Sequence, residues 1–124
     1  MGMNTPEYWL DTAEYDIESA KVMDKATALT LARQYAEEVV KEMSPAKVVL
    51  FGSYAKGNAR EESDIDIAVV FDGFKGDWFR TCTRLSSLTW KVSTHIEPVL
   101  LDIRDDQNGF VAEVLQTGEM VYQH

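Results

Sequence analysis

The fold is decided by residues 47–71, which read KVVLFGSYAKGNAREESDIDIAVVF. Two runs rich in β-branched and aromatic residues, 47–51 and 64–71, enclose a polar stretch that contains the turn formers Gly57 and Asn58. β-branched and aromatic residues fit the pleated surface of a sheet, and Gly and Asn favour turns. This stretch therefore predicts two β-strands joined by a polar loop.

Outside this stretch the apolar residues take the spacing of helices, which places them on one face every three or four residues. Ser44-Pro45 marks the end of the first helix, because the residue before a proline is disfavoured in helical conformation. Residues 96–101 are a third run of strand type, in which Pro98 indicates an edge strand or a bulge. Three helices are expected, over 26–43, 78–92 and 105–116. The sequence thus predicts an α/β (α+β) fold with a small mixed sheet flanked by helices.

Length and charge restrict the class of protein. The chain has 124 residues, the size of a single domain, and 21 Asp and Glu against 12 Lys and Arg give a net charge of −9. Because phosphate groups are bound mainly by Lys and Arg, direct nucleic-acid binding is not expected. No apolar run reaches the roughly 18 residues of a spanning helix and no signal-peptide pattern is present, so we expect a cytoplasmic protein without a membrane partner. The single cysteine, Cys82, excludes an internal disulfide.

Residues 1–22 form a distinct acidic segment. They hold five Asp or Glu and one Lys, a net charge of −4. Their apolar residues follow helical spacing: Trp9, Leu10, Ala13, Ile17 and Ala20. We therefore expect an extra N-terminal amphipathic helix over 1–22 and a separate domain over 23–124. The apolar face must be buried, either on another chain, which would give a homo-oligomer, or on the chain's own domain.

The second strand begins with a pair of carboxylates. Alternation along a strand places Asp64 and Asp66 on the same face, with Cα atoms roughly 6.6 Å apart. Ile65 and Ile67 then face the core on the opposite side. Two carboxylates on one face repel each other, and a divalent cation with oxygen ligands would offset that repulsion.

The first strand ends in Gly52-Ser53, where a glycine permits close approach of the backbone and the serine offers a hydroxyl and an amide to phosphate oxygens. A phosphate-binding turn next to a carboxylate–metal site is the combination that phosphoryl or nucleotidyl transfer requires.

The pattern Gly52-Ser53, ten residues, Asp64-x-Asp66 resembles the signature of the polymerase-β-like nucleotidyltransferase superfamily. GSYAKGNAREESDIDIAVV is similar to its minimal nucleotidyltransferase (MNT) branch, and the likeness extends over about residues 23–122, including VLQTGEMVY near the end. The resemblance implies the nucleotidyltransferase fold, dependence on Mg²⁺, and transfer of AMP from ATP. It also implies a partner, because many MNT proteins are antitoxins paired with HEPN-domain RNase toxins. Residues 8–21 themselves resemble the opening helix of a HEPN domain.

By this match, Gly52 and Ser53 would hold the triphosphate, while Asp64 and Asp66 would hold the metal ions. The family places a third carboxylate on the neighbouring strand, where Glu97 stands in a position at which Asp is commoner. Asp102 is the alternative third ligand, although its parity puts it on the face opposite to Glu97.

Basic residues could neutralise the triphosphate. Lys56 and Arg60 lie in the loop between the two halves of the motif, and Arg84 and Lys91 lie on the helix predicted over 78–92. The predicted function is that of an Mg²⁺-dependent nucleotidyltransferase, an antitoxin that transfers AMP to a tyrosine of a HEPN toxin. The alternative is a non-catalytic antitoxin that only binds its partner and keeps a relic nucleotide site.

Overall fold

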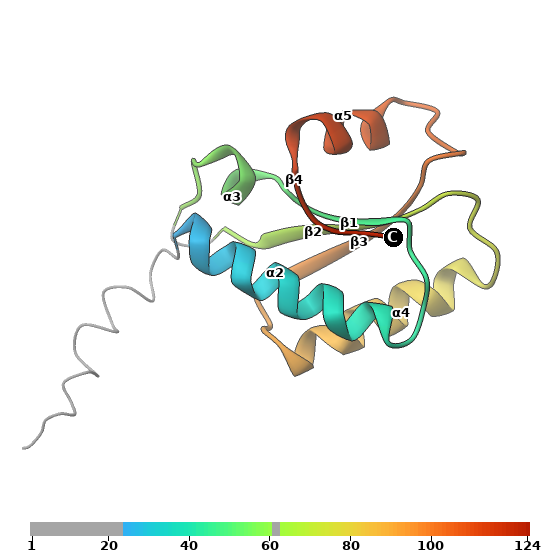
Figure 1. The fold of residues 1–124 in the computed structure, drawn as a ribbon, viewed down its shortest axis with the longest axis horizontal. Coiled ribbons are helices and arrows are strands. Elements are labelled where there is room, and N and C mark those ends of the chain that lie inside the picture. Colours follow the sequence, from blue (N-terminus) through green and yellow to red (C-terminus); the bar gives the residue numbers. More distant parts are fainter. Residues whose placement is uncertain (1–23, 61–62) are drawn as a thin grey trace, which may run out of the picture.

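The computed structural model describes residues 24–60 and 63–124 (Figure 1). The helix and interface predicted for residues 1–22 lie outside the described residues and stay predictions. The described elements are, in chain order, α2 (Lys25–Val40), β1 (Lys47–Phe51), α3 (Ser53–Lys56), β2 (Ile65–Phe71), α4 (Trp78–Leu88), the 3₁₀ turn η1 (Thr89–Lys91), β3 (Ile96–Asp102), α5 (Phe110–Thr117) and β4 (Glu119–Gln123). No described helix combines the length and the apolar composition that crossing a membrane would require.

The four strands form one sheet in the order β3-β2-β1-β4. β1 is antiparallel to both β2 and β4, whereas β2 and β3 are parallel. The predicted mixed sheet is therefore confirmed. Pro98 lies in β3, which is an edge strand, in agreement with the inability of proline to donate a hydrogen bond to a second neighbour.

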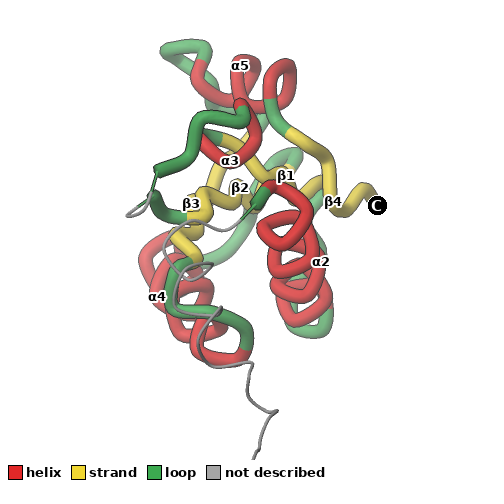
Figure 2. The backbone as a smooth tube through the Cα atoms, turned by 90° about the vertical axis from the view of Figure 1, so that its left-hand side faces the viewer, coloured by secondary structure: helices red, strands yellow, loops and turns green. Residues whose placement is uncertain are grey.

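Helices cover both faces of this sheet. α2 and α4 lie on one side and α5 on the other (Figure 2). Ile65, Ile67 and Val69 of β2 are buried in the larger core with α2 and α4, while Ala68 and Val70 are buried in a smaller core with α5. Burial on both faces explains why most of β2 is apolar, rather than alternating between apolar and polar residues.

The C-terminal part differs from the prediction in two ways. The last helix begins at Phe110 instead of residue 105, because Gly109 takes φ 78°, which a helix cannot continue through. The Asp106 carboxylate instead accepts hydrogen bonds from the amides of Val111 (2.9 Å) and Ala112 (3.0 Å) and so caps the helix. The strand β4 was not predicted. It forms as an edge strand by pairing with β1, a distant segment that the local sequence does not reveal.

Elsewhere the agreement is close. Asp24 caps α2 by accepting a hydrogen bond of 2.8 Å from the amide of Thr27, and α2 ends before Ser44-Pro45 as predicted. The helix predicted over 78–92 is α4 followed by η1. The short helix α3 was not predicted, because its four residues are too few to show a helical period.

Candidate functional site

The predicted carboxylates gather where β2 and β3 begin. Asp66 of β2 is in register with Glu97 of β3 in the parallel pair. Residues in register on neighbouring strands project to the same face, so these two side chains share the face of the sheet that carries α5 further along. Asp64 directly precedes β2 and is exposed, as is Glu97, whereas Asp66 is half-buried.

Gly52 lies against the Asp66 carboxylate. β1 pairs with β2 so that Phe51 is opposite Asp66, and the next residue, Gly52, takes φ 77° and ψ −152°. A Cβ atom built on Gly52 would overlap Oδ2 of Asp66 and would come within 3.1 Å of its Cγ. Glycine is therefore required twice at this position, for the backbone angle and for the space that the carboxylate occupies.

The environment of Asp66 disfavours its charge. Burial raises the pKa of the Asp66 carboxyl above its ordinary value, and the negative charges of Asp64 and Glu97 raise it further. The carboxyl thus pays a free-energy cost for being ionised, which a bound cation would offset. Carboxylate oxygens are ligands that fit a hard cation such as Mg²⁺.

The three carboxylates suit a hard cation by their chemistry, but their side chains are not arranged around a single metal position. Within residues 24–60 and 63–124, no three Asp, Glu, His or Cys side chains are already placed together as ligands of one metal ion. Asp64 and Glu97 are exposed side chains at the start of their strands, where solvent leaves their rotamers free to change. Asp64, Asp66 and Glu97 are the residues of this site that could hold such an ion.

Asp102, the alternative third ligand, has a different role at the other end of β3. Its carboxylate accepts hydrogen bonds from the backbone amides of Gly73 (2.8 Å), Phe74 (2.8 Å) and Arg104 (3.0 Å). These bonds hold the pKa of the Asp102 carboxyl below its ordinary value. Asp102 therefore anchors the loop that follows β2, and Glu97 is the residue in register with Asp66.

The basic residues divide into two groups. Lys56 ends α3 and Arg60 follows it in the same loop; both are exposed, and the Arg60 amide donates to the Ser63 hydroxyl at 2.7 Å. Arg84 and Lys91 instead form ion pairs with α2 and the residues after it, Arg84 with Glu42 and Lys91 with Glu38 at 3.7 Å. The Arg84 side chain thus crosses to Glu42, just after α2, on the face of the sheet opposite to the carboxylates.

Comparison with protein families identifies the family of this chain. Residues 34–124 match the family model described as Polymerase beta, Nucleotidyltransferase. The chain belongs to this family. The nucleotidyltransferase resemblance and the fold predicted from the Gly52-to-Asp66 motif are thereby confirmed.

One known sequence is similar over a short segment. The chain is 51% identical over 39 residues to the "Putative protein adenylyltransferase MJ0604" of Methanocaldococcus jannaschii. The matched segment covers 32% of this chain and 39% of that relative, so the chain spans well under half of the relative's length.

Solved structures of similar fold extend over most of the chain. A "putative nucleotidyltransferase from Sulfolobus solfataricus" is 25% identical with a TM-score of 0.62, and the match covers 85% of this chain and 88% of that one. A structure described as a toxin-antitoxin with AMP-PNP is 23% identical with a TM-score of 0.52, covering 74% of this chain and 73% of that one. At this identity the second likeness concerns the fold alone.

Proposed function

We propose that this nucleotidyltransferase transfers AMP from ATP, with Mg²⁺, to a tyrosine hydroxyl of a partner HEPN toxin and acts as its antitoxin. The observation that carries the proposal is the contact of Gly52 with the Asp66 carboxylate, in register with Glu97. A phosphate bound at the predicted turn would therefore lie beside Asp66, one of the predicted metal ligands. The names of the relatives, an adenylyltransferase and a toxin-antitoxin pair, support the choice of AMP and of a protein acceptor.

Each residue then has a distinct role. Asp64, Asp66 and Glu97 would hold the cation, and the turn at Gly52 and Ser53 would hold the triphosphate beside Asp66. A bound Mg²⁺ ion would neutralise phosphate charge and lower the pKa of the attacking hydroxyl. Lys56 and Arg60 are free to swing from their exposed loop toward the triphosphate and to offset its remaining charge.

In the proposed reaction the acceptor hydroxyl oxygen forms a bond to the α-phosphorus of ATP. The bond from that phosphorus to the oxygen bridging the β-phosphate breaks, and pyrophosphate leaves. The hydroxyl proton is given up to solvent or to a neighbouring carboxylate. Half-burial of Asp66 limits the water around the reacting phosphate, which strengthens the electrostatic interactions there.

A labelling experiment tests this function. The protein is incubated with ATP labelled at the α-phosphate, Mg²⁺ and the protein encoded by the neighbouring gene, and label on that partner is measured. Asp64→Asn and Asp66→Asn should each lower the labelling rate by at least about 100-fold, the effect of removing one electrostatic contributor to a transition state. Glu37→Gln, which changes an exposed acid of α2, is the matched control and should label normally. Labelling that persists in both site variants would contradict the assignment.

A second candidate function is binding without catalysis. It is favoured by Glu97, which is longer than the commoner Asp, and by the absence of a ready-made three-ligand set among the described residues. A binding antitoxin would still protect cells from the toxin when Asp64 and Asp66 are both changed to Asn. An enzyme would lose protection in that double variant while still forming a complex with its partner, which a pull-down measures.

A further inference from the structure

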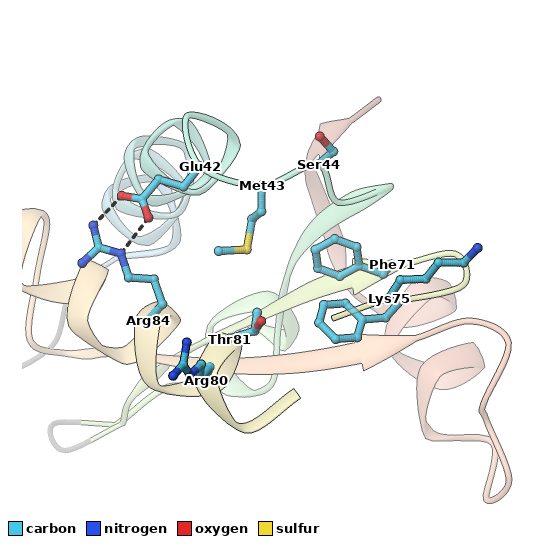
Figure 3. A pocket seen from close by; sticks show the side chains of 9 residues that line it. Glu42, Met43, Ser44, Phe71, Lys75, Arg80, Thr81 and Arg84 are labelled. Carbon is cyan, nitrogen blue, oxygen red and sulfur yellow. Dashed lines mark hydrogen bonds and ion pairs between the residues drawn. The ribbon is translucent and has the colours of Figure 1, made fainter. Parts of the chain in front are cut away.

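A hollow lies at the opposite end of the sheet from the carboxylates. It has a volume of about 520 Å³ and lies between the end of α2, the end of β2 and the first turns of α4 (Figure 3). β2 starts beside Asp66 and ends at Phe71, which lines the hollow. At about 3.3 Å per residue, the two sites are separated by roughly 17 Å along the strand. This volume falls within the range of about 300–1,000 Å³ of small-molecule sites.

The interior of this pocket is apolar and aromatic. Met43, Phe71 and Phe74 line it. The rings of Phe71 and Phe74 meet edge to face with centroids 5.1 Å apart, and Phe74 meets Trp78 in the same way at 5.3 Å. Rings packed edge to face keep a fixed orientation and so form a preformed surface for a planar apolar group.

The mouth of the pocket is positively charged. Arg80 and Arg84 line it from consecutive turns of α4, and Glu42 is the acid among the lining residues. Lys75 lines the pocket from the preceding loop, but its ammonium group points away from Arg80 (Figure 3). The Arg84 Nε donates to Glu42 Oε1 at 2.6 Å, a bridge between α4 and the end of α2 that Figure 3 shows. Neither Arg80 nor Lys75 has an acidic partner within 4.0 Å among the described residues.

This charge is not explained by the stability of the fold. Arg80 and Arg84 against Glu42 give the α4 side of the pocket a net charge of +1, in a chain whose net charge is −9. Like charges four residues apart on a helix, as in Arg80 and Arg84, are destabilising by a few tenths of a kcal/mol. An anion in the mouth would relieve this repulsion and could accept charge-assisted hydrogen bonds from the guanidinium of Arg80.

We propose that this pocket binds a small aromatic anion, a planar ring that carries a phosphate or a carboxylate. The ring rests on Met43, Phe71 and Phe74, and the anionic group meets Arg80. The site is separate from the transfer site and does not depend on the proposed reaction, because none of its lining residues belongs to the Gly52–Asp66 motif or to the start of β3.

Titration monitored by amide NMR tests the site with defined probes. AMP supplies a ring with a phosphate, indole-3-acetate supplies a ring with a carboxylate, and adenosine and inorganic phosphate supply each half alone. We expect saturable shifts of the amides of residues 74–84 with AMP or with indole-3-acetate, and the probe that binds identifies the preferred anion. Adenosine and phosphate should bind at least ten-fold more weakly. If neither aromatic anion shifts these amides, or if phosphate alone binds equally well, the proposal is wrong.

Variants separate this pocket from the transfer site, which AMP could also enter. Arg80→Glu should weaken binding at residues 74–84 at least ten-fold and leave any response of residues 52–56 unchanged. Arg33→Glu makes the same charge change on the exposed face of α2 and should leave both responses as they are. Binding that Arg80→Glu does not weaken, or that Arg33→Glu weakens equally, would show general charge attraction and overturn the proposal. Failure of the labelling experiment would not bear on this result.

Discussion

Gly52→Ala is expected to damage both the stability and the site, and the structure allows its cost to be worked out. Gly52 has φ 77° and ψ −152°, a region that side-chain-bearing residues enter at a cost of about 1–3 kcal/mol. The new methyl group would also overlap the Asp66 carboxylate, which must leave its rotamer at a further cost of about 0.5–1.5 kcal/mol. The free energy of unfolding should therefore fall by roughly 2–4 kcal/mol.

Urea denaturation measures this loss, and Gly57→Ala is its matched control. Gly57 lies at the other end of α3 with φ 80° and ψ 18°, and a Cβ atom there would meet no atom within 4 Å. Its substitution should cost only about 1–2 kcal/mol, the penalty for a left-handed residue. Changing Asp66 to Ala in the Gly52→Ala background should recover about 1 kcal/mol, because the overlap disappears while the backbone strain remains. Equal costs at positions 52 and 57, with no coupling to Asp66, would refute the reasoning.

Three further changes test other parts of the molecule. Asp66→Asn should stabilise the fold near neutral pH without added metal. The pKa of Asp66 is raised in the folded state, so its protonated form stabilises the fold at low pH, and this stabilisation is lost as pH rises from the unfolded-state to the folded-state pKa. Thermal melts of wild type and variant should therefore differ mainly at pH 7 and little at pH 3. Tyr35→Phe removes a buried hydroxyl that donates to the Leu85 carbonyl at 2.6 Å, and urea denaturation should show a free energy of unfolding lower by about 1–2 kcal/mol. A loss near zero would mean that water replaces the bond. Gly118→Ala should lower the free energy of unfolding by about 1–3 kcal/mol in the same measurement, because its Cβ would lie 2.7 Å from the Val114 carbonyl oxygen and would overlap Val49. A variant as stable as wild type would show that α5 shifts without loss of stability.

The pH dependence of Asp66 also provides a test for a cation. A divalent ion that binds the native carboxylates raises stability by mass action and should do so only where these groups are ionised. Adding Mg²⁺ is therefore expected to raise the melting temperature of the wild type at pH 7 and to have little effect on Asp66→Asn. An equal shift in both proteins would place the ion elsewhere.

Local sequence determined the elements and the chemical character of the site. Runs of β-branched and aromatic residues located β1, β2 and β3, because these residue types fit a pleated sheet. Apolar residues spaced about 3.6 apart located α2 and α4, because that spacing places them on one buried face. Alternation along a strand also predicts that Asp64 and Asp66 share one face. The glycine-serine turn and its spacing from these acids carried the resemblance to the family, which the match over residues 34–124 confirms.

Tertiary structure alone decided what depends on contacts between distant segments. The parallel register of β2 and β3 sets Glu97 beside Asp66 and sends Asp102 to the loop amides, and register is a property of two strands together. β4 forms because β1 offers it an unpaired edge, a partner more than 65 residues away in the chain. The cationic pocket likewise joins the end of α2, the end of β2 and α4, so no short stretch of sequence could reveal it.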